Sequence, residues 1–352
     1  MENGRITAGR LTAAAWAAAL APAVGVLPGA TARIAGEGAW LAPVAALPAV
    51  LALGCVLGRL ARQGLAQTFL RLLGGVLGRI LTIIYIVWAL VLASARLRLS
   101  GQRLLFTAQR EVDPWFFLCV LVAAAGWLAW GKADAFVRSA AIFSRILTLT
   151  LAAVLVLTLF RIRADRVWPL WTEDVLPTLK AAVPVLGVLC YGVYAAFLWE
   201  GEAEEGGWKR RAEGGCAALA LLGLSVLGNM GAELTGVLED PFVTLSKYVG
   251  VKGAFQRVES LVSALWLLGD LAMIGLLLWA CRRMVMVIAP GWKGAWVVPA
   301  GAAVVLLGDG LVFRDALLAR RFECGLALWG NLVLGAAVPT VLFLLDRKKE
   351  VG

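Results

Sequence analysis

The chain has 352 residues, of which 61% are hydrophobic, with a mean hydropathy of +0.85 and a formal net charge of +10. This apolar share exceeds that of an ordinary soluble domain, and charged residues gather between apolar runs of about twenty residues, long enough to span hydrocarbon. The sequence contains no histidine, which excludes histidine proton relays, histidine metal ligands and serine–histidine hydrolysis. We therefore predict an all-α membrane protein that forms a single polytopic domain over residues 1–352.

Other classes of function find no support in the sequence. The basic charge alone would suit nucleic acid, but lysine and arginine are usual in the loops of membrane proteins. The six cysteines make no C-x-x-C pair, so we expect neither a disulfide framework nor a metal site. Nucleotide-binding and hydrolase motifs are also absent from the sequence, so we expect a protein that is not an enzyme and has no cofactor.

Ten apolar runs predict ten transmembrane helices, five on each side of a loop at residues 161–178. An odd number of spans per half places the halves in opposite orientations, as in an inverted repeat, with residues 11–160 as the first repeat and 179–345 as the second. The predicted spans are 11–31, 40–57, 80–97, 114–130, 139–160, 179–198, 214–231, 260–280, 295–307 and 324–345.

The orientation follows from the basic residues of the loops, which favour the cytoplasmic side. Basic clusters at 209–211 and 347–349 predict that both termini are cytoplasmic. Arg96, Arg98, Arg103 and Arg110 count against this orientation, because they would lie on the outer side.

Two of the predicted spans contain helix-breaking residues at corresponding places. The first reads P-x-x-G-V-L from Pro22, with Pro28 following, and the sixth repeats this spelling from Pro184 and continues to Gly192. Proline removes a backbone donor and clashes with the preceding turn, so both helices should be broken. Interrupted spans in the two halves indicate a transporter-type binding site at the repeat interface. The alternative is a proline-kinked packing helix without a ligand.

The two breaks would present backbone groups and phenols to a shared cavity. Helix N-termini favour a carboxylate and freed carbonyls favour an ammonium group, so this combination fits a zwitterionic amino acid. The candidate ligand-binding residues are Val24, Gly25, Val26, Leu27 and Gly29 in the first span, Cys190, Tyr191, Gly192 and Tyr194 in the sixth, and Tyr85 in the third, as a gate or as an ordinary packing tyrosine.

Asp270 lies near the middle of the eighth span. An ionisable group at this depth is costly and indicates a functional site. Asp270 is therefore a candidate cation or proton site, or a partner for a buried arginine; a polar contact between two helices is the structural alternative.

A stretch of the second half carries a more specific pattern. An aspartate and a proline at 240–241 precede a short amphipathic segment, then Phe255-Gln-Arg257-Val-Glu259, and then a span with Trp266. We interpret Arg257 and Glu259 as a structural pair at the start of that span. Further elements of the pattern are Asp134 four residues before Arg138, Trp40-Leu-Ala-Pro43, and Trp168-Pro-Leu-Trp171 before the sixth span.

These residues resemble the B subunit of GerA-type spore germinant receptors, over nearly the whole chain. The resemblance implies the amino acid–polyamine–organocation (LeuT-like) fold, with ten helices in a five-plus-five inverted repeat and broken first and sixth helices. It also implies a nutrient sensor of the spore inner membrane, with an A-type membrane subunit and a C-type lipoprotein as partners. Many members have an acidic residue in the broken sixth helix, which is absent from Tyr191–Tyr194.

Three functional hypotheses follow. In the first, the protein is a receptor subunit that binds a small nutrient, such as an amino acid, between the first and sixth helices and signals to partner subunits. In the second, it is a proton- or sodium-coupled amino-acid permease, which would move labelled substrate alone in liposomes. In the third, it is a structural membrane subunit whose pocket no longer binds a ligand.

Overall fold

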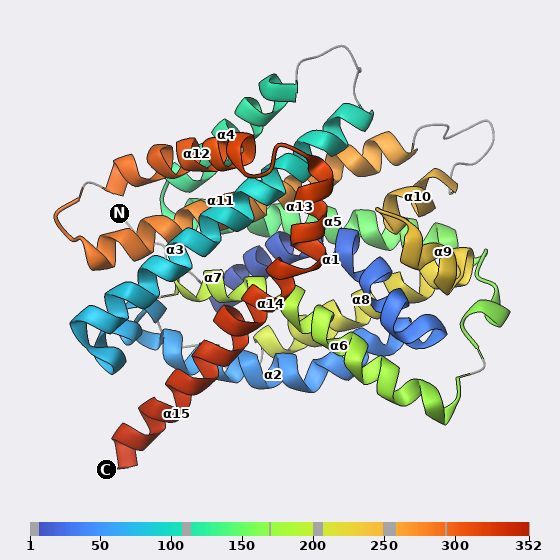
Figure 1. Cartoon of the computed structure of the whole chain (residues 1–352), viewed down its shortest axis with the longest axis horizontal. Helices are drawn as coiled ribbons and strands as arrows, with labels where there is room; N and C mark the ends of the chain where they lie inside the picture. The colour runs from blue at the N-terminus through green and yellow to red at the C-terminus, as the bar shows by residue number, and fades with distance from the viewer. Residues whose placement is uncertain are drawn as a thin grey trace.

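The computed structural model describes residues 7–107, 114–168, 170–199, 207–248, 258–292 and 294–351. Throughout these ranges the elements are helices, with no β-strand (Figure 1). Phe255 and Arg257 of the family-like motif lie outside the described residues. The structure does describe Asp134 and Arg138, which also belong to the family-like pattern. They form an ion pair of 2.9 Å across one helical turn.

The helices follow one another with short connections. The first half contains α1 (Ala8–Ala35), α2 (Ala42–Leu60), α3 (Leu65–Thr107), α4 (Pro114–Trp130) and α5 (Ala133–Leu159), with 3₁₀ turns η1 (Gly36–Leu41) and η2 (Ala61–Gln63) between them. The second half contains α6 (Val175–Leu189), η5 (Cys190–Gly192), α7 (Val193–Ala196), α8 (Gly207–Met230), α9 (Ala232–Val237), α10 (Pro241–Tyr248), α11 (Val258–Ile288), α12 (Gly294–Leu311), α13 (Ala316–Cys324), α14 (Leu326–Leu332), η6 (Val333–Ala337) and α15 (Val338–Val351).

The ten predicted spans are all present as apolar helices. Among the described residues, eight helical stretches are long and apolar enough to cross a membrane. One of them, Ala8–Leu60, contains two predicted spans, because α1 and α2 are joined through η1. The fourth predicted span is α4, which is shorter, with 17 residues. The protein is therefore an integral membrane protein with an all-helical fold.

The first helix lies at the centre of the bundle and packs against α5, α6, α8 and α11 (Figure 1). Small residues allow these helices to approach closely. A Cβ atom on Gly269 of α11 would lie only 3.0 Å from the Cβ atom of Ala21. Because α1 also packs against α6, the first and sixth spans are neighbours, as a site between them requires.

Contrary to the prediction, the first helix is not broken. α1 continues through Pro22 and Pro28 as one helix of 28 residues. Proline at positions 22 and 28 lacks the N–H that would bond to the carbonyls of Ala18 and Val24, four residues earlier. Both prolines are buried where α1 packs against its neighbours, and neighbouring helices allow proline within a membrane helix.

The sixth helix is broken where the sequence predicts it. Its α-helical hydrogen bonding ends at Leu189, and Cys190–Gly192 form the 3₁₀ turn η5 before the single turn of α7. The tenth span meets this turn, since a Cβ atom on Gly335 would lie 2.6 Å from the Cβ atom of Cys190. The missing side chain at Gly335 therefore allows η6 to pack against the break.

Two further interruptions are not apparent from the sequence. In α3, Gly74 has a φ of +82°, so that two helices meet there, and the predicted third span continues to Thr107. The tenth span starts earlier than expected, at Ala316, and is interrupted at Gly325 and again by the π-helical turn η6. The segment α13, before the first of these interruptions, carries charged residues into the bundle.

Candidate functional site

Asp270 belongs to a buried network of ion pairs. Its side chain on α11 is fully buried, and Oδ1 accepts a hydrogen bond of 2.6 Å from Nε of Arg96. Its other oxygen, Oδ2, accepts from Arg103 at 3.1 Å. Arg96 is also fully buried and donates to Glu323 on α13 at 2.7 Å. Of the roles considered for Asp270, the geometry matches the partner of a buried arginine.

This network joins helices from both halves of the chain, since Arg96 and Arg103 lie on α3 while the carboxylates lie on α11 and α13. A second ion pair, between Arg98 of α3 and Asp309 of α12 at 2.8 Å, also joins the two halves of the chain. Burial removes charges from water at a high cost unless each is paired. These arginines are therefore interior groups and do not count as outer loop charges against the predicted orientation.

Arg320 connects the network to the first helix. It lies one turn before Glu323, with 3.9 Å between the two charged groups. Its guanidinium also donates to the backbone carbonyls of Gly25 and Glu239. The carbonyl of Gly25 in the first helix is thus bonded to a cation that belongs to the protein itself.

Among the described residues, the network brings three arginines, Arg96, Arg103 and Arg320, to two carboxylates, Asp270 and Glu323. Charges in a low-dielectric interior interact strongly, so a charged ligand next to Arg103 would change the balance of these ion pairs. Arg103 is the member of the network that borders a cavity.

The cavity next to Gly25 has a volume of about 10 Å³, which holds about one water molecule. Its walls combine opposite charges with aromatic rings, since Arg103 and Asp240 both line it and the rings of Phe242 and Trp266 lie 5.1 Å apart. The described residues that line it are Val24 and Gly25 of α1, Arg103 of α3, Asp240, Phe242 and Val243 at the start of α10, and Val262, Ser263 and Trp266 of α11.

Ser263 supplies a polar atom without a partner in this lining. The residue is 4% exposed, and its buried hydroxyl has no hydrogen-bond partner within the described part of the chain. A buried hydroxyl that stays unpaired costs free energy. A polar ligand in the cavity would satisfy this group.

The structure brings only two of the predicted ligand residues, Val24 and Gly25, to this cavity. Val26 and Leu27 are buried in the apolar core. Gly29 faces α9, where an added Cβ atom would lie 3.4 Å from the carbonyl oxygen of Thr235.

The predicted residues of the sixth span lie elsewhere, in the packing of the broken helix. Cys190, Tyr191 and Tyr194 are buried, and an added Cβ atom at Gly192 would meet nothing within 4 Å. Tyr194 donates to the carbonyl of residue 85 at 3.5 Å.

Tyr85 has a packing role in this structure. It is fully buried, and its hydroxyl donates to the carbonyl of Leu334 in η6. Its ring lies 5.2 Å from Phe69 and 5.4 Å from Phe197. These contacts hold the third and tenth spans together.

Most of the lining residues were missed as ligand contacts, although sequence signals exist for them. Arg96 and Arg103 are seven residues apart, which places them on one face of a helix. Asp240 and Trp266 begin and end the stretch that carries the family resemblance. A long-range pairing such as Arg96 with Glu323 has no local signature and requires the tertiary structure.

Comparison with known proteins gives one family and several solved structures. The family model Spore_permease, described as spore germination protein, matches residues 5–307. A Na⁺-coupled sialic acid symporter in a substrate-bound, outward-open state aligns with a TM-score of 0.59 at 10% identity, covering 98% of this chain and 78% of that one. MhsT in complex with L-phenylalanine aligns with a TM-score of 0.57 at 14% identity, covering 96% and 97%.

Both neighbours are LeuT-fold transporters, and at these identities the likeness shows the fold alone. Among curated proteins, none matches the sequence of this chain. The LeuT-like fold predicted from the sequence is confirmed.

Proposed function

Because the chain belongs to the spore germination protein family, we propose that it is a membrane subunit of a spore nutrient receptor. It binds a small nutrient, an amino acid in our proposal, and signals to partner subunits. Independently of this proposal, the chain is a permease-like integral membrane protein with the LeuT fold.

One observation carries the proposal: the cavity beside Gly25 offers groups of both charges to one small molecule. Arg103 provides a cation for a carboxylate, while Asp240 and the carbonyl of Gly25 provide acceptors for an ammonium group. Phe242 and Trp266 supply an apolar wall for a side chain. Sites of this kind combine apolar walls with a few convergent polar groups.

The same residues offer a way to convert binding into a change of the helix bundle. The cavity holds about one water molecule, so an amino acid fits only if its walls move. A ligand carboxylate competes with Asp270 for Arg103, and an ammonium group at Gly25 competes with Arg320. Binding therefore favours a state in which α3 and α13 hold α1 and α11 less tightly. A ligand shifts the bundle by its difference in affinity for the two states.

The partners and location of the proposal come from the family resemblance. They are an A-type membrane subunit and a C-type lipoprotein, in the spore inner membrane, with both termini of this chain in the cytoplasm. The arginines buried on α3 support this orientation, because they no longer count among the outer loop charges.

The second candidate is an amino-acid permease coupled to protons or sodium. It is favoured by the structural neighbour that is a Na⁺-coupled symporter. A permease moves labelled substrate when it is reconstituted alone in liposomes, whereas a receptor subunit binds without turnover.

The test is thermal unfolding of the purified protein with each of the twenty amino acids and with simple sugars. A ligand at about 100 times its Kd stabilises the folded state by about 2.7 kcal/mol. We expect one amino acid or a few to raise the melting temperature of the wild type, and the Asp240→Asn variant to lose this shift. Arg98→Gln, which breaks an ion pair away from the cavity, should keep it.

Two results oppose the proposal. A shift that is unchanged in Asp240→Asn would exclude the cavity beside Gly25 as the binding site. Uptake of the stabilising amino acid into liposomes by this chain alone would favour the permease. The receptor proposal requires the shift without uptake.

A further inference from the structure

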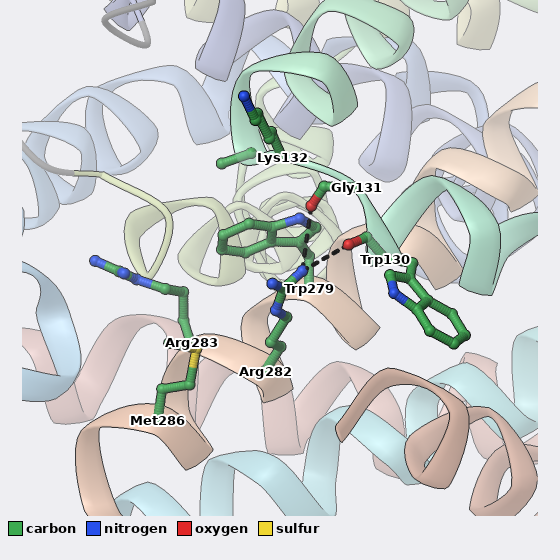
Figure 2. Close-up of a pocket in the computed structure, with 8 residues that line it drawn as sticks. Trp130, Gly131, Lys132, Trp279, Arg282, Arg283 and Met286 are labelled. Carbon is green, nitrogen blue, oxygen red and sulfur yellow. Dashed lines mark hydrogen bonds between the residues drawn. The ribbon is translucent and has the colours of Figure 1, made fainter. Parts of the chain in front are cut away.

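A larger cavity lies at one end of the bundle, away from Gly25, where α4 ends, α5 begins and α11 approaches its C-terminal end (Figure 2). Its volume is about 450 Å³, within the range of small-molecule sites. It is lined by Trp130, Gly131, Lys132, Ala133, Trp279, Arg282, Arg283 and Met286.

The lining is basic and aromatic. Lys132, Arg282 and Arg283 contribute three cationic side chains, and none of the lining residues that the structure describes is a carboxylate. The nearby Asp134 is held by Arg10 at 3.5 Å and by Arg138 at 2.9 Å. The cavity therefore has a net positive potential that favours an anion.

Two buried donors in this lining have no partner. Trp279 is 7% exposed, and its indole Nε1 finds no acceptor among the residues that the structure describes. Nε of Arg282 is likewise buried and has no hydrogen-bond partner within the described ranges. Buried donors are usually paired, so a small shift of either side chain toward a hydrogen-bond acceptor bound in the cavity would satisfy it.

Arg282 is held in place by the surrounding backbone. One of its terminal nitrogens donates to the carbonyls of Trp130 at 2.8 Å and Gly131 at 3.2 Å, as the dashed lines in Figure 2 show. Its guanidinium also lies 5.4 Å from the ring centre of Trp279. The cation is thus fixed before a ligand arrives, which lowers the entropic cost of binding.

The position of the cavity indicates the source of the anion. It lies at the ends of membrane-spanning helices, and the Arg10–Asp134 pair places the start of α1 at the same end of the bundle. Trp130 is 50% exposed and Met286 is also exposed, as expected of residues that contact lipid near the headgroups. The first residue of the long helix α5 lines the cavity and adds the partial positive charge of a helix N-terminus.

We propose that this cavity binds the phosphate group of an anionic phospholipid, with the headgroup between Lys132, Arg282 and Arg283 and the glycerol end toward Trp130 and Met286. Basic pockets between membrane helices recognise anionic headgroups by this chemistry. The site is separate from the nutrient site and does not depend on the proposed receptor function.

The test is native mass spectrometry of the protein from nanodiscs containing phosphatidylglycerol and phosphatidylcholine in equal amounts. We expect the wild type to retain one phosphatidylglycerol in preference to phosphatidylcholine. The double variant Lys132→Gln, Arg283→Gln removes two cations and should weaken retention about 30-fold, because each basic residue near anionic lipid contributes about a factor of five. It leaves Arg282 on its backbone carbonyls, so the fold should persist.

The matched control is Lys209→Gln, Arg210→Gln, which removes the same charge from an exposed basic cluster at the start of α8. Preferential retention that is lost in the first variant and kept in the control supports the site. Equal loss in both variants, or no preference in the wild type, overturns it. Glycerol 3-phosphate is added to the protein in detergent as a second probe, and stabilisation equal to that by the lipid overturns the phospholipid as the source.

Discussion

The buried arginine Arg96 gives the sharpest test of the ion-pair network. The variant Arg96→Met keeps a long side chain of similar volume but removes the charge shared by Asp270 and Glu323. Asp270 retains Arg103 at 3.1 Å, whereas the cation that remains for Glu323 among the described residues is Arg320 at 3.9 Å. Glu323 therefore loses more of its pairing than Asp270 does.

The magnitude follows from this difference. Removing one partner of a buried pair costs about 3–5 kcal/mol, because the other charge stays buried and uncompensated. We expect Arg96→Met to lower the melting temperature of the purified protein in detergent on the order of 10 °C. The double variant Arg96→Met, Glu323→Gln removes the stranded carboxylate as well. It should be more stable than the sum of the two single changes predicts, by about 1–3 kcal/mol.

The control is Glu323→Gln alone, which leaves Arg96 with Asp270. Unfolding is followed by intrinsic fluorescence and by circular dichroism in the same detergent. Melting temperatures that add without coupling between positions 96 and 323 would refute the network as described. So would an Arg96→Met protein as stable as the wild type.

Three further changes are measured by the same thermal unfolding. Gly335→Val should destabilise the protein by about 1–3 kcal/mol, because the new side chain overlaps the sixth-helix break; normal stability would contradict this packing. Tyr85→Phe should cost about 1 kcal/mol, since the carbonyl of Leu334 loses its donor, and no change would argue against this bond. Gly74→Ala should destabilise by about 1 kcal/mol or more, because the φ of +82° suits glycine; its matched control is Gly75→Ala, which should be neutral or stabilising, and equal effects would refute the kink.

The arrangement of the spans was predictable because hydrophobic length is a local property. Ten apolar runs and a break at Cys190–Gly192 can be recognised from the residues alone, and the structure has them. The first helix shows where local reasoning fails. Pro22 and Pro28 predict a break, but α1 is continuous where it packs among the surrounding helices.

The site was harder to predict because it depends on pairing across the bundle. Asp270 was identifiable as a buried charge from its place in an apolar span, and a buried arginine was one of the partners considered. Arg96 and Arg103 were assigned to the outer surface, because a charge near the end of a predicted span is usually a loop charge. Only the tertiary structure shows that α3 continues to Thr107 and that these arginines point into the bundle.

Binding of an amino acid beside Gly25 is the central claim, and a structure of the protein with a stabilising amino acid tests it most directly. We expect the ligand carboxylate within hydrogen-bond distance of Arg103, its ammonium group near Asp240, and the 3.1 Å contact between Arg103 and Asp270 lengthened or broken. A ligand bound at the Cys190–Gly192 turn instead, with Arg103 still on Asp270, would contradict the account.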